Sequence, residues 1–537
     1  MKKLLALALA LVMVLALAAC GSSGGNTTSS NNSGNSGSSG DTASDVTTGE
    51  DGEVVLRVGT SDNMGSFLLG GGSGSNYRGV YLVFDSIFYF DENKEPYSTV
   101  LEDWYYQDDC TFVMELKDGI YFSNGEQMDA EDLLFSVFIY EESGSNFAGL
   151  YSAFNQEKSY VSEDGMTAYL VSDEPFGPGL FQANLPIYSK DWADEVGLES
   201  ELWMTNPVGS GPYICTDYQT DASCTLEKRD DYWDDTYENE IDRYEILYYK
   251  EDSTMYIDLE TGTIDIACNI SNSDYARGVD GGTENVAVEQ LMCGDVIFLN
   301  FDVDGNEYLA DPKVREAIAY GVDWMEVAQA SRGDMATAAT SIIAADSPYH
   351  VDCGAYEYDP ERAAQALSES QYAGQQIDIY LVNLNEEVKD EMATVLQYYL
   401  SQLGINLTFE DFDFPNALTQ WLEEGGTDIT FQDSDTGSIT GEPFVSLRFM
   451  MEGYGPFPVC TIQDETFADL AEKAISTIDE AERLDYYTQL QQYSYENYLM
   501  IPIFNAADAI AWRTDVVEST GIQNPTDVNL RNVKLVH

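Results

Sequence analysis

The sequence predicts an α/β fold that is divided into several domains. Strand patterns and helix patterns occur in mixed order along the chain, and neither is confined to one part. The chain has 537 residues, and one domain holds about 100–200 residues, so the length predicts about three domains. Hydrophobic residues make up 44% of the chain, which is a normal content for packed cores.

Two stretches show the pattern of β-strands. Residues 53–60, EVVLRVGT, are rich in β-branched side chains. In residues 110–119, CTFVMELKDG, the apolar residues Phe112, Met114 and Leu116 alternate with other residues. This alternation is typical of a strand with one buried face.

Three stretches show the pattern of helix starts. Residues 129–142, DAEDLLFSVFIYEE, begin with Asp129, which is a suitable N-cap, and acids follow in the first turn. Residues 311–323 and 359–370 both begin with Asp-Pro. Asp can cap a helix, and Pro is tolerated at the first helical position, so both segments are predicted helices.

The N-terminal segment predicts export and lipidation. Two lysines follow Met1, and residues 4–19 are apolar without a break. A membrane-spanning helix needs about 20 such residues, so this run is typical of a signal peptide. The sequence Leu17-Ala18-Ala19-Cys20 resembles the lipobox of bacterial lipoproteins, whose cysteine receives a diacylglyceryl group. We predict a lipoprotein signal peptide over residues 1–19, with lipidation of Cys20; an ordinary signal peptide is the alternative.

The segment that follows and the charge of the chain limit the partners. Residues 20–50 are mainly Gly, Ser, Asn and Thr, which predicts a flexible tether. The net charge is −71, which argues against a nucleic-acid partner because phosphate binding needs a basic surface. The acids predict a solvated surface, with a cationic ligand as the alternative. Two acyl chains on Cys20 would hold the protein at the membrane without a basic patch.

The remaining cysteines give two candidate disulfides and no metal site. None lies in a C-x-x-C pair, and His350 and His537 are the only histidines, so we predict no zinc site and no cofactor. Export permits disulfides. Cys215 and Cys224 flank a predicted turn at 220–221 and are the first candidate pair. Cys268 with Cys293 is a weaker candidate pair. The other cysteines after Cys20 are Cys110, Cys353 and Cys460.

Catalysis has little support in the sequence. A Ser-His-Asp arrangement needs a histidine, and one of the two histidines is the last residue. No phosphate-binding loop of the Walker type occurs. We therefore predict no catalytic residues and a binding protein rather than an enzyme, with a surface hydrolase as the competing class.

Four stretches occur in an order that resembles a known family. Residues 83–136 contain LKDG, FSNG and AED; NPVGSGPY (206–213) precedes RDDYW (229–233). GTIDIA (262–267) and FLNFDVDGNEYLADPKVREAIAYGVD (298–323) follow. Together they resemble the family 5 extracellular solute-binding proteins, which are the oligopeptide, dipeptide and nickel receptors of ABC importers.

The resemblance implies a two-lobed, hinge-linked fold of the periplasmic-binding-protein type with an inserted domain. The first lobe would comprise residues 51–80, 205–294 and 506–537, the inserted domain residues 81–204, and the second lobe residues 295–505. Closure would bury a ligand between the lobes. The implied partners are an ABC permease and ATPase, and we expect a monomer, anchored by lipid on the outer face of the cell membrane.

Two of the matching stretches are interpreted as structural. Pro207, Gly209, Gly211 and Pro212 set a tight backbone path, which predicts a crossing between lobes that touches no ligand. We interpret Tyr232-Trp233 as core residues in the same way.

The resemblance also implies candidate ligand contacts. In peptide-binding relatives an aspartate before "[DE]P" holds the peptide amino group. Residues 428–449, DITFQDSDTGSITGEPFVSLRF, contain Glu442-Pro443, with an insertion between this pair and the acids. Asp435 or Asp433 would therefore bind an amino group, and solvated loop acids are the alternative. Phe431 lies near the position where an arginine serves some peptide receptors.

The glycine-rich residues 68–79 fall where relatives line the cleft, and a mobile surface loop is the alternative. This segment adds Tyr77 and Arg78 to the candidates. Arg78 and Arg448 would each face a ligand carboxylate or neutralise neighbouring acids. The implied function is capture of short peptides. The alternatives are an oligosaccharide or chelated-metal receptor, or a sensory or adhesive surface protein.

Overall fold

A computed structural model describes most of the chain beyond residue 51. The described residues are 52–62, 65–68, 78–143, 151–181, 185–303, 305–384, 387–412, 416, 426–435, 441–444, 447, 464–524 and 528–537. They belong to one compact unit, Ser44–His537. The predicted signal peptide, Cys20 and the tether lie outside the described residues, as do Tyr77, Arg448 and Cys460.

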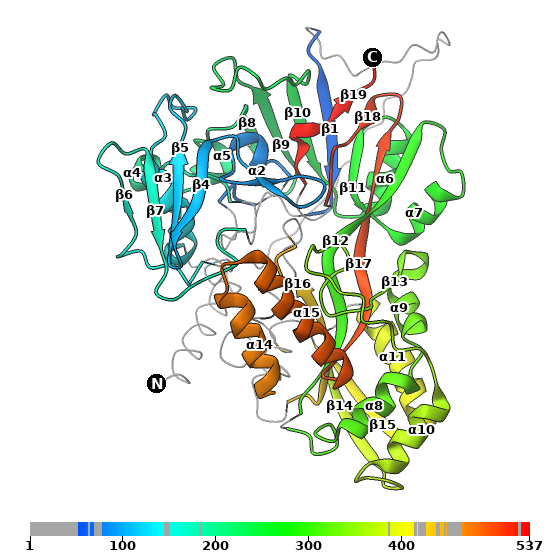
Figure 1. Cartoon of the computed structure of the whole chain (residues 1–537). Helices are drawn as coiled ribbons and strands as arrows, with labels where there is room; N and C mark the ends of the chain where they lie inside the picture. Colours follow the sequence, from blue (N-terminus) through cyan, green and yellow to red (C-terminus); the bar gives the residue numbers. More distant parts are fainter. Residues whose placement is uncertain are drawn as a thin grey trace, which may run out of the picture. The chain divides into compact units, whose positions relative to one another are not determined.

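One large mixed sheet runs through both lobes (Figure 1). Its strand order is β15-β14-β16-β12-β17-β11-β1-β10-β9-β8, and β13 also pairs with β17. The strands are β1 Val55–Thr60, β8 Tyr213–Gln219, β9 Ser223–Lys228, β10 Arg243–Tyr248, β11 Ile266–Ile270, β12 Val286–Phe301, β13 Thr337–Ala338, β14 Ile377–Leu384, β15 Ile405–Phe412, β16 Ile429–Asp435 and β17 Met500–Arg513. The strand predicted over residues 53–60 is thus confirmed.

Two long antiparallel strands connect the lobes. β12 pairs with β16 from Asp295 to Phe301 at its carboxyl end, and β17 pairs with β11 from Ala509 to Trp512. Each strand therefore has one end in each lobe, as Figure 1 shows in green and red. The predicted two-lobed α/β fold is confirmed. The predicted lobe boundaries after residues 294 and 505 fall inside β12 and β17, so these strands are the connection between the lobes.

A second, smaller sheet lies within residues 81–204 and has the antiparallel order β4-β5-β7-β6. Its strands are β4 Leu101–Asp108, β5 Thr111–Leu116, β6 Tyr160–Val161 and β7 Thr167–Val171. The short strands β2 Tyr89–Phe90 and β3 Pro96–Tyr97 pair beside it, and β18 Val517–Ser519 pairs with β19 Lys534–Leu535 near the carboxyl terminus.

Three of the described helices begin where the sequence predicts helix starts. Asp129 caps α3, because its carboxylate accepts a hydrogen bond from the Glu131 amide at 2.7 Å. Asp311 and Asp359 cap α8 and α10 in the same way. The helices are α2 Val80–Val83, α3 Ala130–Glu142, α4 Lys190–Val196, α5 Leu202–Thr205, α6 Asp252–Glu260, α7 Asn272–Val279, α8 Pro312–Gly321, α9 Trp324–Arg332, α10 Pro360–Glu369, α11 Glu387–Gln402, α14 Glu465–Ser476 and α15 Glu480–Glu496.

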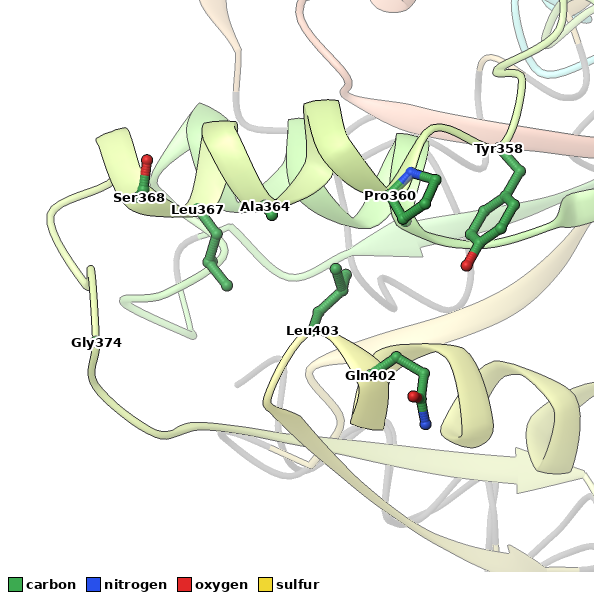
Figure 2. Close-up of a pocket in the computed structure, with 9 residues that line it drawn as sticks. Tyr358, Pro360, Ala364, Leu367, Ser368, Gly374, Gln402 and Leu403 are labelled. Carbon is green, nitrogen blue, oxygen red and sulfur yellow. The ribbon is translucent and has the colours of Figure 1, made fainter.

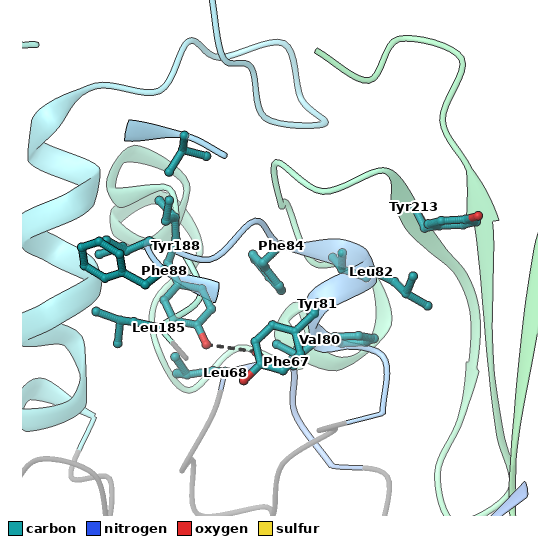
Figure 3. Packing of buried hydrophobic residues seen from close by; sticks show 14 of the residues in the cluster. Phe67, Leu68, Val80, Tyr81, Leu82, Phe84, Phe88, Leu185, Tyr188 and Tyr213 are labelled. Carbon is teal, nitrogen blue, oxygen red and sulfur yellow. Dashed lines mark hydrogen bonds between the residues drawn. The ribbon is translucent and has the colours of Figure 1, made fainter. Parts of the chain in front are cut away.

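The first lobe and the inserted domain share one hydrophobic core. Figure 3 shows part of it, where the Phe84 and Tyr188 rings meet edge to face with centroids 5.0 Å apart. The Tyr188 hydroxyl donates a hydrogen bond to the Phe67 carbonyl oxygen at 3.3 Å. Phe112, Met114 and Leu116 of β5 face this core, as predicted. The strand does not have only one buried face, however, because Thr111 and Val113 on its other side are buried as well.

The NPVGSGPY segment packs backbone against backbone. A Cβ atom on Gly211 would lie 2.5 Å from the Leu82 carbonyl oxygen, and one on Gly209 would overlap the Val83 carbonyl oxygen. Arg229 donates from Nη1 to the carbonyl oxygens of Gly209 at 3.3 Å and of Gly211 at 3.2 Å. These contacts agree with the structural interpretation of this segment.

We expect Gly209→Ala to lower the free energy of unfolding by about 1–3 kcal/mol, because the added methyl group forces a shift of packed backbone. Urea denaturation followed by circular dichroism would measure the loss. Asn206→Ala, an exposed change three residues earlier, is the control. An equal, small effect of both variants would contradict the close packing.

Tyr232 and Trp233 hold a buried carboxylate. The Tyr232 hydroxyl donates to Asp85 Oδ1 at 3.0 Å, and Trp233 Nε1 donates to Asp85 Oδ2 at 2.8 Å. Arg531 Nη2 lies 2.7 Å from Asp85 Oδ1, and both charged groups are buried. The interpretation of Tyr232-Trp233 as core residues is in line with these contacts.

The cysteine predictions have different outcomes. Cys215 and Cys224 lie on β8 and β9, whose hairpin turns at residues 220–222, with their sulfur atoms 3.8 Å apart. This separation is longer than a disulfide bond, which is about 2.05 Å, so the disulfide stays a prediction. The weaker pair is wrong. Cys268 on β11 and Cys293 on β12 are free thiols on strands separated by β17. Two strand spacings are about 10 Å, which exceeds the Cα separation of a disulfide.

Candidate functional site

The candidate site lies beside the middle of the paired strands β12 and β17, which connect the lobes. We call this part of the two strands the crossing. The carboxyl ends of strands from both lobes approach it. In the first lobe, β1 is parallel to β10 and to β11, so their carboxyl ends share one edge. Ile270 at the end of β11 lies opposite Ala509, near the middle of β17. In open α/β sheets, ligands bind outside the carboxyl ends of the strands.

The second lobe presents the same kind of edge from the other side. β14 is parallel to β16, and β16 is antiparallel to β12. Asp435 at the end of β16 lies opposite Asp295 of β12. The register therefore directs the carboxyl ends of β11 and β16 toward the same part of the two connecting strands.

The crossing itself contains a β-bulge. The pairing of β12 with β17 shifts register between Met292 and Val296, and Gly294 has φ +79°. Arg332 lies 3.0 Å from Asp508 of β17 at this level. A bulge bends a strand and redirects its side chains, so it is a suitable hinge. We missed this feature in the sequence, although a glycine inside a strand pattern is its usual signal.

The first-lobe edge carries the predicted residue Arg78. Its side chain is buried, with 2% of its surface exposed. Its Nη2 pairs with Asp62, and its Nε donates to Thr60 Oγ1 at 3.3 Å. Asn269 donates to Asp62 Oδ2 at 3.3 Å. Of the two roles considered for Arg78, the structure supports neutralisation of an acid.

The second-lobe edge carries the other predicted contacts. Phe431 on β16 has 6% of its surface exposed and belongs to the hydrophobic core of the second lobe. The structure places it in this core, and its role as a ligand contact stays a prediction. The backbones of Asp433 and Asp435 lie opposite Ile297 and Asp295, and their side chains are outside the described part.

Comparison with known proteins identifies the family. Residues 95–454 match the family model of the bacterial extracellular solute-binding proteins, family 5 (middle region). The chain belongs to this family. As a family 5 protein it is an extracellular solute-binding protein.

Two curated relatives illustrate the range of the family. The chain is 23% identical to heme-binding protein A of Haemophilus influenzae over 434 residues, covering 75% of this chain and 77% of that protein. It is 24% identical to the dipeptide-binding protein of Escherichia coli over 419 residues, covering 72% and 76%.

Solved structures of low identity share the fold. The ABC transporter substrate-binding protein CtaP of Listeria monocytogenes superposes with a TM-score of 0.76 at 20% identity, over 90% of this chain and 99% of that one. DppA of Helicobacter pylori in complex with the peptide STSA gives 0.68 at 19% identity, over 90% and 98%. NikA of Staphylococcus aureus with Ni(L-His)2 gives 0.67 at 18% identity, over 90% of this chain and 100% of that one.

The glutamate of the "[DE]P" pattern is buried in this family 5 protein. Glu442 has 2% of its surface exposed, and its Oε1 accepts a hydrogen bond from the Tyr487 hydroxyl at 2.5 Å. Arg483 Nε lies 3.8 Å from Glu442 Oε2. Burial raises the pKa of Glu442, although Arg483 and Tyr487 act in the other direction. These partners make Glu442 a structural residue.

A pocket of the family 5 protein lies elsewhere, on the second lobe. It has a volume of about 300 Å³ and lies between α10 and α11, lined by Tyr358, Pro360, Leu367, Gln402 and Leu403 among others (Figure 2). None of the predicted ligand contacts lies in it.

Within the described ranges, no three His, Cys, Asp or Glu side chains gather closely enough to hold a metal ion. None of the helices described combines the length and apolar character needed to cross a bilayer.

Proposed function

We propose that this protein is the membrane-anchored receptor of an ABC importer and captures short peptides between its lobes. One observation carries the proposal: the carboxyl ends of β11 in the first lobe and of β16 in the second lobe approach the same part of β12 and β17. Open α/β sheets bind ligands outside the carboxyl ends of their strands. The bulge beside this crossing suits a hinge that closes over the ligand.

The charges near the crossing favour a ligand with an amino group. Arg78 is paired with Asp62, and Arg332 is paired with Asp508. Asp433 and Asp435 end β16 on the opposite side. A buried ammonium needs a carboxylate partner, and these two acids are our candidates for the amino terminus of a peptide. The dipeptide-binding relative and the DppA complex support a peptide as the ligand class.

A thermal-shift screen of peptides, oligosaccharides and metal chelates would test the receptor function. A ligand that binds only the native state stabilises it by about 2.7 kcal/mol at a hundredfold excess over Kd. We expect short peptides with a free amino terminus to raise the midpoint most. Mass spectrometry of ligands that copurify with the signal-free protein gives independent identification. A screen without any shift, and no copurified ligand, would contradict the proposal.

A second ligand class is favoured by the relatives. One curated relative is a heme-binding protein, and one structural neighbour holds Ni(L-His)2. A chelated metal in place of a peptide would raise the midpoint in the chelate arm of the same screen. An oligosaccharide ligand would instead raise the midpoint in the oligosaccharide arm of the screen. Adjacent permease and ATPase genes would distinguish a transport receptor from a sensory or adhesive protein.

The proposed anchor gives a separate prediction. We expect Cys20→Ala to release the protein from membranes and to leave its thermal stability unchanged. The anchor and the fold are separated by a tether of about 30 residues, which is too long to transmit strain. Fractionation of cells that express both forms measures the effect. Recovery of the variant in the membrane pellet, in the same amount as the unchanged protein, would contradict lipidation at Cys20.

A further inference from the structure

The inserted domain contacts the second lobe at more than one place. Lys94 Nζ lies 3.0 Å from Asp346 Oδ2, and a short loop that follows β7 makes the contacts described next. The Gly177 amide donates to the Ile475 carbonyl oxygen at 2.7 Å. The Gly177 carbonyl oxygen accepts from Arg483 Nη1 at 2.9 Å. Both backbone groups of one residue are therefore satisfied by the second lobe.

Arg483 reaches this loop from a buried position at the start of α15. Its Nη2 donates to the Tyr349 hydroxyl at 2.8 Å, and its Nη1 also donates to the Thr477 carbonyl oxygen at 3.2 Å. Its charge is balanced by Glu442, which is buried as well. A buried charge pair is stabilised only when its hydrogen-bonding groups are satisfied. The Gly177 carbonyl is one of those groups, so the pair depends on the inserted domain.

An aromatic contact adds apolar area to the same interface. The rings of Phe176 and Phe444 meet edge to face, with centroids 5.0 Å apart and planes at 82°. Phe176 is 3% exposed and Phe444 is 6% exposed. Phe444 follows the Glu442-Pro443 pair in the second lobe, yet it packs in the core that the inserted domain shares with the first lobe. Separation of the two parts would expose both rings to water, which is unfavourable.

We propose that Phe176, Gly177, Phe444 and Arg483 form a latch that fixes the second lobe to the inserted domain and must break before the ligand cleft opens. β12 and β17 connect the lobes at one place, and a hinge there leaves the rest of the second lobe free to move. The latch is a further connection at another place, beside the ion pair of Lys94 with Asp346. Because Glu442 and Phe444 come shortly after Asp433 and Asp435 in the chain, the latch also restrains the segment that we assign to the ligand. This last point rests on the proposed function.

Gly177→Ala tests the latch with little change inside either part. The new Cβ atom would overlap the Thr477 carbonyl oxygen and lie 3.1 Å from Arg483 Cδ. The three nearest atoms all belong to the second lobe, so the methyl group opposes docking and leaves the packing of the inserted domain intact. Glu174→Ala is the matched control, because Glu174 is exposed and lies three residues away in the same loop. Gly177→Val is the stronger version.

Two measurements on the ligand-free protein decide whether the contact is a latch. We expect Gly177→Ala to increase the radius of gyration in small-angle X-ray scattering. We also expect at least tenfold faster amide exchange in peptides that cover residues 441–444 and 475–483, with unchanged exchange in β5. Glu174→Ala should match the unchanged protein in both. Unchanged exchange and radius would overturn the proposal, and so would faster local exchange at an unchanged radius.

The dissociation rate of a bound peptide gives the third readout. If the latch forms only in the closed state, its loss lowers the fraction of protein molecules in the closed, binding-competent conformation. We therefore expect Gly177→Ala to bind the peptide about tenfold more weakly and to release it faster. Binding that stays equal or becomes tighter, while the radius increases, would overturn the coupling to the ligand. Absence of binding by the unchanged protein would contradict the proposed function, and the scattering and exchange results would still decide the latch.

Discussion

Replacement of Arg531 by methionine should lower the free energy of unfolding by about 3–5 kcal/mol. Arg531 Nη2 lies 2.7 Å from Asp85 Oδ1, and Asp85 is fully buried. Removal of one partner of a buried ion pair leaves the other charge without compensation. Tyr232 and Trp233 would still donate to Asp85, but neutral donors cannot balance its charge.

Urea denaturation followed by circular dichroism measures this loss. Lys534→Met is the matched control, because it removes a positive charge from an exposed position three residues away. We expect the control to change stability by less than about 0.5 kcal/mol. Arg531→Met with Asp85→Asn should recover part of the loss, since no charge then remains buried. A loss below about 1 kcal/mol for Arg531→Met would show that the pair contributes little.

Replacement of Asp435 by asparagine should weaken the binding of a peptide with a free amino terminus by about 2–5 kcal/mol. The same change should have little effect on the N-acetylated peptide, which carries no ammonium. The reason is that a buried ammonium without a carboxylate partner is strongly unfavourable. Asp433 is two residues earlier on β16, so Asp433→Asn is the companion variant.

Isothermal titration with the two peptide forms measures the difference. Glu410→Gln is the control, because it removes an exposed negative charge from β15 of the same lobe. Equal losses for both peptide forms, or no loss for either, would exclude Asp435 from the site. A loss that also occurs with Glu410→Gln would indicate a general effect of the net charge.

Local features of the fold could be predicted from the sequence. Asp129, Asp311 and Asp359 cap helices through contacts with amides two or three residues later, so short stretches contain all the information. The buried face of β5 follows from alternation within ten residues. The two-lobed architecture came from the resemblance to a family, because no local pattern specifies how segments far apart in the chain combine.

Features that depend on strand order and distant partners could not be predicted. Asp85 and Arg531 are 446 positions apart, and Gly177 and Arg483 are 306 apart. The pairing of Cys268 with Cys293 failed because β17 lies between their strands. The burial of Phe431 in the second-lobe core depends on the place of β16 in the sheet. In each case the outcome depends on tertiary pairing, which the spacing of residues along the chain does not reveal.

The position of β17 in the sheet has a consequence for biosynthesis. This strand begins at Met500, yet it pairs with β11 of the first lobe and along most of β12. The ribosome must therefore complete nearly the whole polypeptide before the strand pairing that joins the two lobes can form. Folding that depends on such distant segments is slow and late, and it does not proceed domain by domain during synthesis. A chain that ends before Met500 would leave edges of β11 and β12 unpaired, and such edges promote aggregation.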